Sequence, residues 1–128
     1  MTKKRLVLSL ICAVAAVFFA VKCIAFADAQ KNNIEFLKSY GWEVNAMPIE
    51  RVEINIPDPF DRVYDNYNLL QLDADLDLSP YKGKECVRYT YLVTNYPEDV
   101  GEEVRANVIC CDGTPIGGDI MTVILRHG

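Results

Sequence analysis

Histidine is almost missing from this sequence, since His127, next to the last residue, is the only one. Serine is also scarce, and only Ser39 and Ser79 remain after residue 27. The five cysteines include no C-x-x-C pair and are too few for a disulfide-rich miniprotein. These shortages exclude the common zinc motifs and leave no set of serine, histidine and acid for nucleophilic catalysis. We therefore predict no metal and no cofactor.

Acidic residues are absent from residues 1–27, which contain Lys3, Lys4, Arg5 and Lys22. The whole chain has 13 basic and 18 acidic residues, so residues 28–128 carry 9 bases, 18 acids and a charge of −9. An acidic domain of this kind repels the phosphates of nucleic acids and of anionic lipid headgroups. We expect no nucleic acid partner.

A long apolar run follows the first basic residues. It extends from Leu6 to Val21, and small residues at Ala25 and Ala27 precede Asp28. This order is typical of a secretory signal peptide that is cleaved between Ala27 and Asp28. An uncleaved signal anchor is the alternative, since a helix from Leu6 to Ala27 is about 33 Å long and the bilayer core is about 30 Å thick.

Both interpretations divide the chain at residue 27. Residues 1–27 are a signal peptide or signal anchor, and residues 28–128 are a single exported domain without repeats or linkers. The basic start stays inside the cell in either case, so the domain is secreted or extracytoplasmic. Contact with the membrane is expected only through residues 6–27, and only if they are not cleaved.

Two helices are predicted in the exported domain. The first begins at residue 28 or 32 and ends at residue 40, because Gly41 fits the position that follows a helix C-terminus. The second begins with Asp58 as its N-cap and Pro59 in its first turn. Apolar residues recur along it at helical spacing and are expected to face the core: Phe60, Val63, Tyr64, Tyr67 and Leu70.

One strand is predicted before the second helix and three after it. Val52, Ile54 and Ile56 alternate with polar residues, as in a half-buried strand. The other strands cover residues 85–96, 102–111 and 116–125, and Asp112-Gly113 forms the last turn. The order α-β-α-β-β-β predicts an α+β fold with two helices packed on one face of a mainly antiparallel sheet of about four strands.

Several phrases of the sequence, taken in order, resemble a known family. They are FLKSYGWEV (36–44), YDNYN (64–68), YKGK (81–84), RYTY (88–91), NYP (95–97) and IGGD (116–119). The resemblance covers nearly all of residues 31–121. It is to small exported or lipoprotein-like proteins of Gram-positive bacteria that form a family of unknown function. The resemblance implies an exported α+β domain, and it supplies no activity, ligand or catalytic residue.

Alternating carboxylates at Asp73, Asp75 and Asp77 match the first ligands of a calcium loop. Leu78 stands where that loop needs glycine, and Lys84 stands where it needs a bidentate glutamate. We therefore expect a solvated acidic loop.

The glycines of Gly117-Gly118-Asp119 predict a bulge or a close backbone approach within a strand. Asp119 is the only acid between Ile116 and Leu125. Its side chain either points outward, contacts a partner, or is buried and hydrogen-bonded. We treat Asp119 as a candidate interaction residue.

The sequence favours a non-catalytic module, exposed in the cell envelope, that binds another protein or an envelope component. Its last strand would be a docking surface by strand addition if it lies at the sheet edge. A small hydrolase that uses carboxylates such as Glu53 or Asp119 is the first alternative. A structural component of the envelope is the second.

Cys86 and Cys111 are candidates for a disulfide between neighbouring strands. The alternation of apolar residues and the turn at residues 97–100 together select a register in which the numbers of partner residues add to 197. Cys86 then lies opposite Cys111 on the outer face of the sheet, whereas Cys110 points into the core as a buried thiol. Export permits this oxidation, and free thiols at both positions are the alternative.

Overall fold

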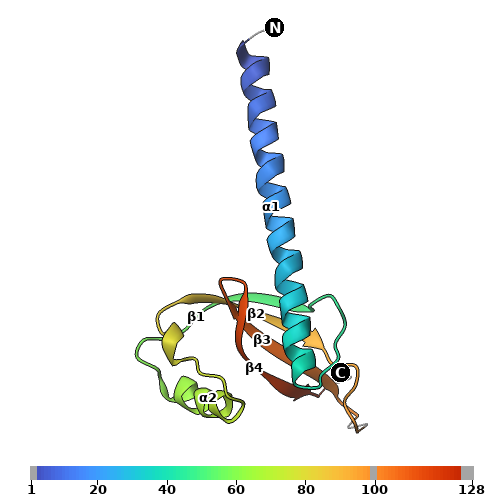
Figure 1. The fold of residues 1–128 in the computed structure, drawn as a ribbon, viewed down its shortest axis with the longest axis vertical. Helices are drawn as coiled ribbons and strands as arrows, with labels where there is room; N and C mark the ends of the chain where they lie inside the picture. Colours follow the sequence, from blue (N-terminus) through green and yellow to red (C-terminus); the bar gives the residue numbers. More distant parts are fainter. Residues whose placement is uncertain (1–2, 99–100, 125–128) are drawn as a thin grey trace.

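A single long helix, α1, forms the N-terminal part of the chain (Figure 1). The structure, a computed structural model, describes residues 3–98 and 101–124. Helix α1 runs over Lys3–Ser39 without a break at residue 27, and Gly41, with φ of +88°, follows its end as predicted. The predicted signal segment and the predicted first helix are thus one continuous helix.

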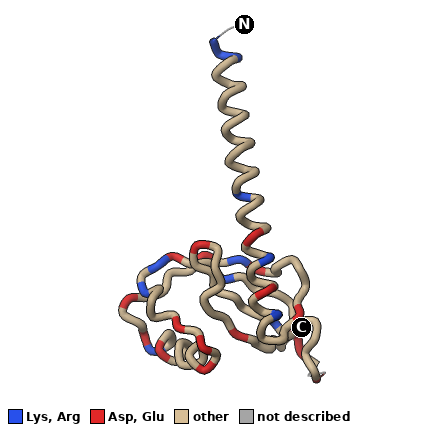
Figure 2. The backbone as a smooth tube through the Cα atoms, viewed as in Figure 1, with Lys and Arg blue, Asp and Glu red and all other residues tan. Residues whose placement is uncertain are grey.

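The first part of α1 projects away from the rest of the molecule. Its apolar side chains are exposed, and the helix is long and apolar enough to cross a membrane. Basic residues lie at its free end, and acidic residues begin only where it reaches the domain (Figure 2). This helix is consistent with a signal sequence or a membrane anchor.

Four strands form one antiparallel sheet in the order β1-β2-β3-β4. Their bounds are Glu50–Asn55 for β1, Glu85–Leu92 for β2, Glu103–Cys111 for β3 and Thr114–Val123 for β4. Helix α2, Arg62–Asp73, follows β1, and the short 3₁₀ helix η1, Ser79–Tyr81, precedes β2. The predicted α+β class and element order are confirmed.

The predicted register of the β2–β3 hairpin is also confirmed. Val87 lies opposite Cys110 and Tyr91 opposite Ala106, so the numbers of partner residues add to 197. The turn that selected this register includes residues 99 and 100, which lie outside the described residues. In the next hairpin Asp112 and Gly113 have φ of +52° and +77°, as a tight hairpin turn requires.

The prediction that both helices pack on one face of the sheet is wrong. The end of α1 covers one face, where Leu37 packs with Tyr91 and Val108. The chain from β1 through α2 to η1 covers the other face, where Cys86 and Ile109 are buried. Both faces of β2 and β3 carry apolar side chains, and each face therefore needs its own cover.

Helix α2 also differs from its predicted form. Its N-cap is Asp61 instead of Asp58, because the Asp61 carboxylate accepts a hydrogen bond from the Tyr64 N–H at 2.8 Å. The apolar stripe is only partly buried, and Val63 and Leu70 remain 72% and 61% exposed. Buried residues of α2 are instead polar: Asn68 and Gln71.

Candidate functional site

The cysteine pair lies at one end of the β2–β3 hairpin. One step beyond the Val87–Cys110 pair, the same register places Cys86 opposite Cys111. Both are buried thiols, 3% and 5% exposed, in the cluster on the α2 side of the sheet. The predicted outer face is therefore covered by protein. Burial and the contact with Cys111 raise the pKa of Cys86 to about 12.

Cys110 belongs to a buried chain of polar contacts that fixes α1 to the sheet. Its Sγ donates to Asn33 Oδ1 at 2.8 Å, and Asn33 Nδ2 donates to Tyr91 Oη at 3.0 Å. The Tyr91 hydroxyl in turn donates to Gln30 Oε1. Burial raises the pKa of Cys110 to about 11 and that of Tyr91 to about 12. The prediction that Cys110 is a buried thiol is confirmed.

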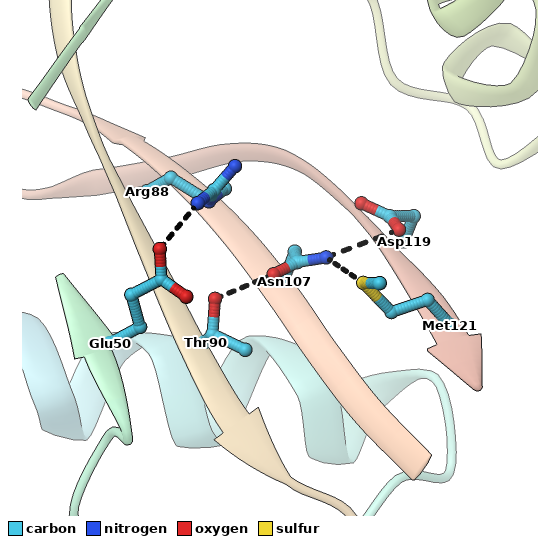
Figure 3. Close-up of polar contacts among 6 residues, drawn as sticks. All are labelled: Glu50, Arg88, Thr90, Asn107, Asp119 and Met121. Carbon is cyan, nitrogen blue, oxygen red and sulfur yellow. Dashed lines mark hydrogen bonds and ion pairs between the residues drawn. The ribbon is translucent and has the colours of Figure 1, made fainter. Parts of the chain in front are cut away.

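A row of polar side chains crosses the α2 side of the sheet from β1 to β4 (Figure 3). This polar row consists of Glu50, Arg88, Thr90, Asn107 and Asp119. Arg88 Nη2 donates to Glu50 Oε1 at 2.9 Å, and Thr90 Oγ1 donates to Asn107 Oδ1 at 2.7 Å. Asn107 Nδ2 donates to Asp119 Oδ2 at 3.3 Å. The polar row thus links all four strands through their side chains.

Asp119 also joins the polar row to α2. Tyr67 Oη donates to Asp119 Oδ1 at 2.6 Å, across a groove of about 210 Å³. Burial, and then this hydrogen bond, raise the pKa of Tyr67 far above its usual range, so its hydroxyl remains a donor at neutral pH. Of the alternatives for Asp119, the structure shows a partly buried, hydrogen-bonded carboxylate. Because these groups largely bind one another, the main role of the polar row is to hold the sheet and α2 together.

The backbone N–H and carbonyl of Gly118 point to the outer side of β4, which is an edge strand of the sheet. The Gln71 carboxamide pairs with its backbone as a neighbouring strand would: Gln71 Nε2 donates to the Gly118 carbonyl at 2.8 Å, and the Gly118 N–H donates to Gln71 Oε1 at 2.9 Å. A Cβ at Gly118 would lie 2.3 Å from the carbonyl oxygen of Asn107. The ladder is irregular beside Ile109 and Cys110, where β4 bulges. The predicted bulge and close backbone approach are confirmed.

The rest of the outer edge of β4 is not covered in this way. Backbone groups of alternate residues point to the same side of a strand, so those of Ile120 and Thr122 point outward like those of Gly118. The Val104 carbonyl accepts from the N–H of Val93, directly after β2, so the backbone groups of its partner Thr122 point away from β3. No described residue pairs with the outward backbone groups of Ile120 and Thr122. We call Ile120–Val123 the free β4 edge.

An apolar pocket of about 120 Å³ lies beside the free β4 edge. Side chains from the end of α1, from the chain after α2 and from β4 line it, among them Phe36, Tyr40, Trp42, Leu76 and Ile120. Tyr40 Oη donates to the Ala74 carbonyl at 3.0 Å, so α1 and the chain after α2 meet next to β4. Edge and pocket together form a surface that can accept both the backbone and a side chain of an added strand.

Comparison with protein families gives one match, to a domain of unknown function, DUF4830, over residues 36–120. The chain belongs to the DUF4830 family. Comparisons with curated proteins and with solved structures give no significant match. The matched residues of this DUF4830 domain include the polar row, Gln71 and all residues that line the apolar pocket, whereas the first 33 residues of α1 precede them.

The carboxylates proposed for a hydrolase do not meet in this DUF4830 domain. Glu53 lies on β1 at one edge of the sheet, and Asp119 lies on β4 at the other edge and on the opposite face. Among residues 3–98 and 101–124, no three acidic, cysteine or histidine side chains are placed to hold a metal ion. His127 lies outside the described residues.

The third carboxylate of the acidic loop has a structural role. Asp77 Oδ1 accepts from Asn68 Nδ2 at 3.0 Å and from the Ser79 N–H at 2.9 Å. These bonds, that from Asn68 foremost, lower the pKa of Asp77. Asp73 and Asp75 are exposed, as a solvated acidic loop requires.

Gln71 and Tyr40 were not predicted as site residues, because their partners at Gly118 and Ala74 lie 47 and 34 positions away.

Proposed function

We propose that this chain is an exported, non-catalytic binding module of the cell envelope. Its free β4 edge takes up an extended segment of a partner protein by strand addition. The observation that carries this proposal is the pair of outward-facing backbone positions, Ile120 and Thr122, beside an apolar pocket. Main-chain hydrogen bonds along such an edge supply affinity, and a neighbouring pocket selects the side chain that enters it.

The position of Gln71 supports the same interpretation. Its carboxamide makes both strand-like hydrogen bonds to Gly118, and this pairing supports the proposal that the outer side of β4 accepts an added strand. Proteins usually protect a free strand edge, because an exposed edge pairs with other chains. Here the protection ends at Gly118, and the two following outward positions stay open to a partner.

The N-terminal helix supports an extracytoplasmic location. The basic residues at its start favour the cytoplasmic side, and its exposed apolar residues suit the bilayer. Docking of α1 on the sheet begins at the boundary of the exported domain, with Ala29 and Gln30 buried. The ring centroid of Phe26 lies 6.4 Å from that of Tyr89, and cleavage after Ala27 would remove this contact.

Either processing outcome leaves the domain outside the cytoplasm. Cleavage yields a mature N-terminus at Asp28 and a protein that is found in the medium or in the soluble envelope fraction. A full-length chain that needs detergent for extraction establishes the anchor instead. Peptide mapping of the N-terminus after fractionation distinguishes the two.

The strand-addition proposal is tested by capture from envelope fractions with the full-length chain as bait. Thr122→Pro removes the outward N–H while the hydrogen bonds to β3 remain, and proline is tolerated on edge strands. We expect this variant to lose the captured partner and the control Thr122→Ala to keep it. With the partner bound, the amides of Ile120 and Thr122 should exchange with deuterium more slowly. Equal capture by Thr122→Pro, with its fold checked by circular dichroism, overturns the proposal.

A further inference from the structure

We infer that the segment added to the free β4 edge is basic, with lysine or arginine alternating with apolar residues. The inference rests on the proposed strand addition and names the chemistry of the partner. Successive side chains of an added strand point to opposite faces of the sheet, so they meet two different surroundings at β4. One surrounding is apolar and aromatic, and the other is acidic.

The apolar surrounding lies on the face that α1 covers. Ile120 packs on the cluster around Leu37 on this face, and the rings of Tyr40 and Trp42 line the pocket together with it. Tyr40 is 45% exposed. An apolar side chain of the added strand that points to this face enters the pocket.

The acidic surrounding lies at the end of α2 and at Asp119, which shares the opposite face with Met121 of the free β4 edge and with Arg105, itself ion-paired to Glu103. Asp119 points to that face, and its carboxylate keeps acceptor capacity beyond the bonds from Tyr67 and Asn107. Asp73 and Asp75 stand on either side of Ala74, which lines the pocket. The C-terminal end of α2 adds a partial negative charge at the same place.

The charge of the whole domain favours the same partner. Residues 28–128 carry 9 bases and 18 acids, a charge of −9. The last turn of α1 contains one basic residue, Lys38. A second copy of the chain would bring the same acidic surface to the edge, and like charges would oppose that pairing. A basic segment is attracted instead, most strongly at low ionic strength.

The test uses three labelled eight-residue peptides in which valine alternates with lysine, with threonine or with glutamate. Their affinities for the full-length chain in detergent are measured by fluorescence anisotropy at low and at physiological salt. We expect the lysine peptide to bind about tenfold more tightly than the threonine peptide at low salt, as a few exposed ion pairs provide. The glutamate peptide should bind most weakly, and added salt should reduce the differences.

Two matched variants locate the effect. In the double variant Asp73→Asn with Asp75→Asn, the affinity of the lysine peptide should fall to within about threefold of the affinity of the threonine peptide, since most of the ion-pair contribution is removed. Glu53→Gln with Glu85→Gln changes the net charge equally at the opposite side of the sheet and should leave the preference intact. A preference that both double variants reduce equally reflects net charge alone and overturns the inference.

The outcomes separate this inference from the proposed function. Equal binding of all three peptides, abolished by Thr122→Pro, overturns the basic segment and leaves strand addition in place. Failure of the lysine peptide to bind at about 1 mM also overturns the basic segment. The capture experiment with Thr122→Pro then decides the proposed function by itself.

Discussion

Oxidation of the folded chain is expected to join Cys86 to Cys111 and to leave Cys110 as a thiol. Residues directly opposite in an antiparallel pair have Cβ atoms about 4.5–5.5 Å apart, and a disulfide needs about 3.5–4.5 Å. A small shift at the ends of β2 and β3 is therefore sufficient. Cys110 points to the other face and donates to Asn33, away from both partners. With oxidised glutathione as the acceptor, each thiol of the pair loses one proton and one electron.

The bond closes a loop of about 25 residues between β2 and β3. A chain-entropy estimate for a loop of that length gives a stabilisation of about 3.5 kcal/mol. For a domain of about 100 residues this corresponds to a rise in Tm of roughly 15 °C. Burial holds the pKa of Cys86 near 12, so little thiolate is present at pH 7. The rate of oxidation should therefore increase about tenfold for each pH unit between 7 and 9.

The assay starts from a chain in which Cys12 and Cys23 are replaced by alanine, so that only the domain thiols react. Intact mass after alkylation, with and without reduction, counts the thiols, and thermal unfolding measures the gain in stability. Cys111→Ser should abolish the gain. Cys110→Ser should keep it, because a serine hydroxyl can still donate to the buried asparagine. Three reactive thiols in the oxidised, denatured protein would refute the prediction.

Three further predictions concern stability. Gln71→Ala removes both hydrogen bonds to Gly118 together with buried side-chain volume. Urea unfolding should show that the free energy of unfolding decreases by about 2–3 kcal/mol. A decrease below about 0.5 kcal/mol would contradict the strand-like pairing. Gly118→Ala places a Cβ 2.3 Å from the Asn107 carbonyl oxygen. Urea unfolding should show that the free energy of unfolding decreases by about 3 kcal/mol or more. An unchanged urea midpoint would show that the two strands separate easily. Stability should fall between about pH 9 and 12, because burial raises the pKa of Cys110 to about 11 and that of Tyr91 to about 12, and the unfolded chain releases these protons first. A flat pH profile up to pH 11 would contradict the buried polar chain.

The N-terminal segment could be predicted from the sequence because its signals are local. An apolar run behind basic residues predicts a membrane-compatible helix without any knowledge of the domain. The continuity of α1 through residue 27 could not be read in the same way, because it depends on Ala29, Asn33 and Leu37 packing against the sheet.

The hairpin register could be predicted because two constraints coincide. The alternation of apolar residues fixes the parity of the pairing, and the predicted turn at residues 97–100 then leaves one value. The pairs Val87–Cys110 and Tyr91–Ala106 follow from these local rules. The glycines at positions 117 and 118 likewise marked the close approach of β4 to its neighbours.

The sequence by itself therefore determined the order of the main helices and strands and the pairing of β2 with β3, since each depends on contacts between nearby residues. Only the tertiary structure decided which face each helix covers and which side of α2 is buried. Asn68 and Gln71 replace the expected apolar residues in the interior because they bond the backbone at Leu78 and Gly118. A buried polar side chain is stable only where such partners exist, and in a folded chain those partners come from distant parts of the sequence.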